Sequence, residues 1–118
     1  MSTLKTNTIK NTDDVEMYLA KAWVNFNGQG TVAIRAAGNV SSITDNGTGD
    51  YTVNFTNAMP DDNYSTTGTT VGANGTNTAC FNLYSVASSQ LTNSVRVTLV
   101  NNSNASVDRE YVSVTIFR

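Results

Sequence analysis

The chain has 118 residues, 14% charged residues and a net charge of −2, so its length allows one domain built around one hydrophobic core. Its seven Lys and Arg residues are scattered, whereas nucleic-acid binding needs clustered cations, so we expect no nucleic-acid partner. The chain has no histidine, which excludes Ser-His-Asp and Cys-His nucleophiles and imidazole metal sites.

The N-terminal sequence lacks the apolar segment of a secretory signal. No stretch approaches the roughly 18 apolar residues that a membrane helix needs, so we expect synthesis in a cytoplasm without membrane insertion. Cys80 is the only cysteine, which rules out an intrachain disulfide and a cysteine-based zinc cluster. Its neighbours Ala79 and Phe81 predict a strand position, where a thiol behaves as a small hydrophobe.

Residues 1–20 are predicted to form an extended N-terminal arm. The segment is polar, with isolated apolar residues at Leu4, Ile9, Val15, Met17 and Leu19. Fully extended, it reaches at most about 65 Å, which is enough to cross a neighbouring subunit. We take Leu4, Ile9, Val15 and Met17 as candidate assembly contacts; the alternative is a frayed terminus with a short first strand.

Residues 21–118 alternate apolar and polar side chains with a period of two, which predicts a single all-β domain. The expected strands lie near residues 21–26, 32–36, 39–44, 51–56, 64–71, 79–84, 95–99 and 111–117. Seven to eight strands at spacings near ten residues are typical of a sandwich or a small barrel. We expect a single antiparallel β-sandwich of the jelly-roll or immunoglobulin-like type.

The last expected strand, residues 111–117, carries apolar or aromatic side chains on both faces. Either both faces are covered within the domain, or one face meets another subunit. The other large aromatic residues are divided between two expectations. Trp23, Tyr51, Phe55 and Phe81 are expected in the core, whereas Tyr64 and Tyr84 could lie in the core or at a binding surface.

Two loops are candidate binding elements, because loops on a rigid scaffold often carry recognition. Asp45–Asp50 is predicted to be a hairpin loop, since Asn-Gly accepts the positive φ angles of such turns. Gly72–Asn77 is the second loop. The candidate receptor-facing residues are Asp45, Asn46, Asp50, Asn74 and Asn77.

Loop carboxylates raise two chemical alternatives, calcium binding and glycoside hydrolysis. Asp45, Asn46 and Asp50 surround a Gly-containing loop, but their spacing is not that of an EF-hand, so we expect no metal and no cofactor. The paired acids at 13/14, 45/50, 61/62 and 108/110 fall in predicted turns. Asp is favoured there by hydrogen bonds to the backbone, so we expect no enzymatic activity.

Several stretches carry a resemblance to known proteins. The run from Leu19 through Ala-Trp-Val-Asn-Phe-Asn-Gly to Arg35, the run from Asn39 through Ile-Thr-Asp-Asn-Gly-Thr-Gly-Asp-Tyr to Thr56, and Met59-Pro-Asp together resemble a module of tailed-bacteriophage virion proteins. The start, Ser2 to Ile9, resembles the starts of phage tail-fibre-like proteins. The resemblance implies a non-enzymatic, outward-facing part of a phage virion, often assembled as a trimer.

Within that class we expect a capsid cement or decoration protein, because the chain contains no shaft repeat. Its partners would be itself, as a homotrimer, and other virion proteins such as the major capsid protein. The alternative is a tail-fibre or appendage tip that binds a host-surface glycan or protein through the two predicted loops.

Overall fold

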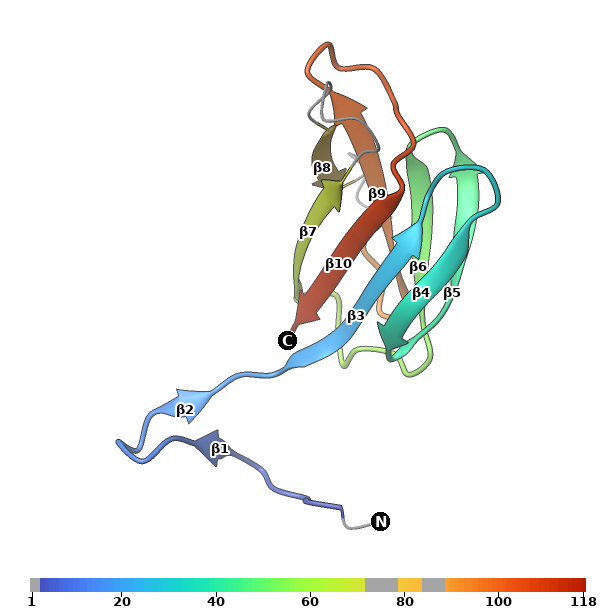
Figure 1. Ribbon diagram of the computed structural model, residues 1–118. Coiled ribbons are helices and arrows are strands. Elements are labelled where there is room, and N and C mark those ends of the chain that lie inside the picture. Colours follow the sequence, from blue (N-terminus) through green and yellow to red (C-terminus); the bar gives the residue numbers. More distant parts are fainter. Residues whose placement is uncertain (1–2, 72–78, 84–88) are drawn as a thin grey trace.

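Antiparallel strands make up almost all regular structure in the computed structural model, which describes residues 3–71, 79–83 and 89–118 (Figure 1). Two short strands, β1 (Ile9–Lys10) and β2 (Glu16–Met17), pair with each other outside the main sheets. The eight longer strands form two four-stranded sheets, which we call the body. The predicted all-β class with antiparallel sheets is confirmed.

The first sheet has the order β4-β3-β10-β7 and the second the order β5-β6-β9-β8. The strands are β3 (Ala20–Asn27), β4 (Ala33–Gly38), β5 (Val40–Gly47), β6 (Asp50–Phe55), β7 (Ser65–Val71), β8 (Ala79–Leu83), β9 (Ser94–Asn101) and β10 (Tyr111–Phe117). Cys80 therefore lies in a strand, as its sequence neighbours predicted.

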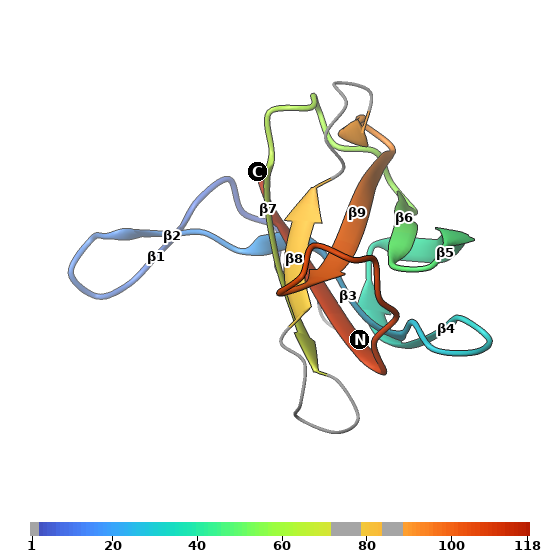
Figure 2. The same ribbon diagram turned by 90° about the horizontal axis from the view of Figure 1, so that it is seen from above.

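One hydrophobic core lies between the two sheets, which face each other in both views (Figures 1 and 2). Alternate residues of β3, β10, β6 and β9 supply it, and the fully buried large side chains are Val24, Phe26, Tyr51, Val53, Val95, Val97, Leu99, Val112, Val114 and Ile116. The rings of Phe26 and Tyr51 join the two sheets edge to face, with centroids 5.2 Å apart. Each such side chain stabilises the fold by roughly 1.5–3 kcal/mol.

The core prediction was right for Tyr51 and Phe55 but wrong for Trp23, whose side chain is 43% exposed. The alternation of β3 puts Ala22 and Val24 inside, so Trp23 lies on the opposite face. Its indole lies against Gly38 of β4, where an added Cβ would come within 2.9 Å of the ring. Tyr64, left open by the sequence, is buried, and the side chains of Phe81 and Tyr84 lie outside the described part.

The predicted hairpin between residues 45 and 50 forms, but its loop is shorter than expected. β5 continues to Gly47 and β6 begins at Asp50, so only residues 48 and 49 connect them. Gly49 has φ +63°, and a Cβ there would lie 2.6 Å from the carbonyl oxygen of Leu99. The same Cβ would also lie 2.7 Å from the carbonyl oxygen of Val107, so the turn packs against both β9 and the chain that follows it, which explains its tightness.

Three loops meet at the end of the body far from the N-terminus, formed by residues 28–32, 48–49 and 102–110, which we call the distal end (Figure 1). The Tyr51 Oη lies 2.7 Å from the carbonyl oxygen of Gly28 and 2.6 Å from Asp108 Oδ1. Asp108 also accepts the backbone N–H of Gly49 at 2.8 Å. One buried phenol and one carboxylate thus join the three loops.

Candidate functional site

The N-terminal arm, residues 3–19, projects from the body at the start of β3, on the side opposite the distal end (Figures 1 and 2). Asn11 forms its turn, because the side-chain oxygen accepts the N–H groups of Asp13 and Val15. Lys10 and Asp14 form an exposed ion pair across the same turn. Such a short two-stranded hairpin gains little stability by itself.

The arm places the candidate assembly contacts in solvent. Leu4 is 83% exposed, and Val15 and Met17 are 57% and 52% exposed, while Ile9 is partly covered. Leu19, at the junction with β3, is also more than half exposed. Large apolar side chains gathered on one projecting segment are typical of a surface that a partner covers.

A groove of about 900 Å³ separates the arm from the base of the body. The body contributes Ser65, Phe117 and Arg118 to its walls. The Arg118 guanidinium makes two hydrogen bonds to Asp61, at 2.8 and 2.6 Å, and holds the pKa of that carboxyl well below its usual range. This pair pins the end of β10 beside the groove.

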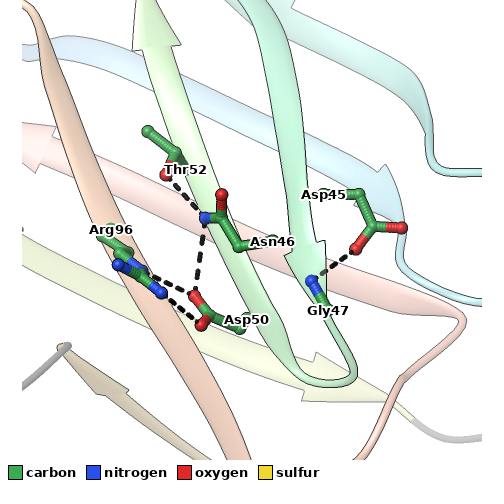
Figure 3. Close-up of polar contacts among 6 residues, drawn as sticks. All are labelled: Asp45, Asn46, Gly47, Asp50, Thr52 and Arg96. Carbon is green, nitrogen blue, oxygen red and sulfur yellow. Dashed lines mark hydrogen bonds and ion pairs between the residues drawn. The ribbon is translucent and has the colours of Figure 1, made fainter.

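Asp45, Asn46 and Asp50 lie together at the β5–β6 turn (Figure 3). The Arg96 guanidinium bonds both oxygens of Asp50, at 2.8 and 2.6 Å, and lowers the pKa of that carboxyl. Asn46 donates to the Thr52 hydroxyl at 2.8 Å, and Asp45 accepts the N–H of Gly47. These groups stabilise the hairpin, and a calcium ion at Asp50 would have to displace the guanidinium.

The other two candidate receptor-facing residues, Asn74 and Asn77, lie outside the described residues. Structural partners hold two of the acidic residues that a glycosidase could use, Asp61 and Asp108. Asp61 accepts the N–H of Asn63 and pairs with Arg118, and Asp108 bonds Tyr51 and Gly49. Each of these carboxylates has a structural partner.

Sequence reasoning missed Asn39, which connects the two sheets. Asn39 adopts φ +56° between β4 and β5, and its amide donates to the carbonyl oxygens of Lys21 and Asn57. The same side chain accepts the Asn57 N–H at 2.8 Å. Asn tolerates this left-handed conformation better than most residues, which is the signal that could have located the corner.

The sheet β4-β3-β10-β7 carries exposed apolar side chains on the side that points away from the core. They are Trp23, Val71, Tyr111 and Phe117, and we call this surface the outer face. The sequence analysis predicted such side chains only for residues 111–117. The Arg35 guanidinium lies 4.2 Å from the centre of the Tyr111 ring and donates to the carbonyl oxygen of Glu110. β10 is thus central within its sheet, but the structure covers only one of its faces.

The chain matches no model of a known protein family, no curated protein and no solved structure. In the described part of the chain, no three His, Cys, Asp or Glu residues are grouped so that they could hold a metal ion. The same residues include no helix long and apolar enough to span a membrane. The candidate functional features of the structure are the arm, the outer face and the distal end.

Proposed function

We propose that the protein is a non-enzymatic structural part of a phage virion, a capsid cement or decoration protein that attaches to neighbouring subunits through its arm. The observation that carries the proposal is the exposure of Leu4, Val15 and Met17 on a segment outside both sheets. An arm of this kind buries its exposed apolar side chains only on a partner. The phage assignment is supported by the sequence resemblance of residues 2–9, 19–35, 39–56 and 59–61.

We further infer that the two sheets constitute an eight-stranded β-sandwich. Support comes from the single core that their inner faces share and from the antiparallel pairing of β3 with β10, which brings the first and last strands of the body together. The order β4-β3-β10-β7 differs from the ABED order of constant-type immunoglobulin domains, so the sandwich we propose is not of that type. Such a rigid body suits a protein that bridges capsomers.

Quantitative densitometry of purified virions tests the cement assignment. A decoration protein should be present in hundreds of copies per particle, and a band of only a handful of copies would contradict it. Immunogold labelling should place the protein over the capsid surface. In the same particles, the double variant Met17→Ser/Leu19→Ser should fail to incorporate, whereas Leu91→Ser, which changes an exposed apolar residue of the body, should incorporate normally.

A receptor-binding appendage tip is the second candidate, favoured by the position of the distal end. The three distal loops face away from the arm, and Tyr51 and Asp108 hold them in one arrangement (Figure 1). A protein anchored by its arm would therefore present these loops to a host surface. Purified protein should then block phage adsorption, and particles without the protein that adsorb normally would exclude this function.

A further inference from the structure

We propose that the arm of one copy of this chain docks on the outer face of a second copy, covering Trp23. This inference deepens the proposed function, since it rests on the arm as the attachment element and names the surface that receives it. A single chain leaves both surfaces open. Trp23 remains 43% exposed, and the arm leaves β3 in a direction away from its own sheet (Figure 1).

The two surfaces are complementary in apolar character. The arm offers Leu4, Val15, Met17, Tyr18 and Leu19, each more than half exposed. The outer face offers Trp23, Val71, Tyr111 and Phe117, which are 43%, 60%, 39% and 38% exposed. The Trp23 indole lies against Gly38, and its 43% exposed area is available for a partner to cover.

The charges of the two surfaces are also complementary. The strands β3, β4, β7 and β10 contain only two charged residues, Lys21 and Arg35, and both are cationic. The arm hairpin, residues 9–17, contains Lys10 together with Asp13, Asp14 and Glu16, so its net charge is −2. An acidic hairpin approaching a weakly cationic sheet is favoured, whereas two outer faces placed against each other would bring like charges together.

The reach of the arm and the position of the groove fit the same arrangement. The arm projects beyond the base of its own body, and the molecule measures 45 Å along its longest axis against 30 and 28 Å along the other two (Figure 1). The groove beside the arm includes Phe117, an outer-face residue, so the two surfaces are continuous. A neighbouring arm that enters this groove can therefore continue along the sheet toward Trp23.

Because the arm and the outer face are different surfaces, the contact between two copies is heterologous and can close into a ring such as a trimer.

Trp23 is the only tryptophan of the chain and reports directly on this contact. The experiment mixes two full-length variants. The receiver, Met17→Ser/Leu19→Ser, has a weakened arm and an intact Trp23. The donor, Trp23→Thr, has an intact arm and no tryptophan, so all emission excited at the red edge of the absorption band comes from the receiver.

Adding the donor should shift the receiver's Trp23 emission to shorter wavelength, protect it from iodide quenching and produce a mixed oligomer in sedimentation equilibrium. A Trp23→Thr chain that also carries Met17→Ser/Leu19→Ser is the matched control and should bind at least about tenfold more weakly, since loss of two buried apolar contacts exceeds 1.4 kcal/mol. If the Trp23→Thr donor fails to fold, Trp23→Phe replaces it.

Two outcomes overturn the proposal. Mixed oligomers without any change in Trp23 emission would mean that arms pair with arms. Unaltered emission with both proteins monomeric would mean that a molecule other than a second copy of this chain covers the outer face. Either result leaves the virion assignment standing, because copy number and labelling on particles test that assignment separately. Conversely, a low copy number on virions leaves the docking of arm on outer face intact.

Discussion

Tyr51 is the residue whose single side chain connects most of the distal end. Its ring lies fully in the core against Phe26, and its hydroxyl lies within hydrogen-bond distance of Gly28 O and Asp108 Oδ1. A phenol has one proton, so it donates to one of these acceptors at a time. A Cβ at Gly28 would lie 2.7 Å from Tyr51 Oη, which explains why a glycine occupies that position.

Tyr51→Phe should lower the free energy of unfolding by about 1.5–3 kcal/mol, because it removes a buried hydrogen bond to a carboxylate. Urea denaturation followed by circular dichroism measures the change. Tyr18→Phe is the matched control, since Tyr18 is 75% exposed on the arm, and should leave the unfolding midpoint unchanged. Equal effects of the two substitutions would show that the contact of Tyr51 with Asp108 contributes nothing.

Tyr64 makes the stability sensitive to alkaline pH. Burial, helped by the charge of Asp62, raises the pKa of Tyr64 from 10.0 to about 12. Between these values the unfolded chain loses the phenolic proton and the folded chain keeps it, so the stability contributed by the neutral phenol is present below pH 10 and is lost as the pH rises toward 12.

The free energy of unfolding of the native chain should therefore fall more steeply above pH 10 than that of Tyr64→Phe. Urea titrations across this range, at constant ionic strength, measure both slopes. Identical slopes would contradict a buried phenol at this position. Tyr18→Phe serves again as the control and should follow the native curve.

At the scale of elements, the β5–β6 hairpin depends on an ion pair to the neighbouring strand β9. Arg96 and Asp50 face each other across the sheet, with side chains 35% and 19% exposed. The bidentate geometry strengthens the pair and the partial exposure weakens it, which gives a contribution of about 1 kcal/mol. The pair therefore adds to the β6–β9 pairing that the core already specifies.

Arg96→Met should lower the free energy of unfolding by about 1 kcal/mol near neutral pH. The pKa of Asp50 is lowered in the folded chain, so this contribution is present above the ordinary value of 3.8 and is lost as the pH falls through the lowered pKa. The native and variant proteins should thus converge in strong acid. Lys10→Met, which removes the exposed pair with Asp14, should have no effect at any pH.

At the scale of the whole molecule, the arm should contribute to assembly but not to the thermal stability of the body. Deleting residues 1–14 removes Leu4 and Ile9, which the body does not bury, so the melting temperature of the body should barely change. Assembly should be lost, because the deleted segment carries apolar side chains that only a partner covers. Differential scanning calorimetry and sedimentation measure the two properties. A large drop in melting temperature, or normal assembly, would contradict the arm as a tether.

The sequence by itself determined the fold class and most strands, because a period of two in apolar residues has only one structural solution when one face is buried. Thus the alternation at residues 51–56 and 111–117 predicted β6 and β10 with bounds correct to within a residue. It also indicated the unusual composition of residues 1–20, whose isolated apolar residues lie outside both sheets in the structure.

Only the tertiary structure decided which side chains meet. Asp108 follows Tyr51 by 57 residues and Arg96 follows Asp50 by 46, and no local pattern links such pairs. Trp23 also shows that residue type alone does not predict burial. A large aromatic residue suggests a core position, but the alternation of β3 and the space above Gly38 place Trp23 on the outer face. Alternation separates the two faces of a strand, but the packing of the sheets decides which face is covered.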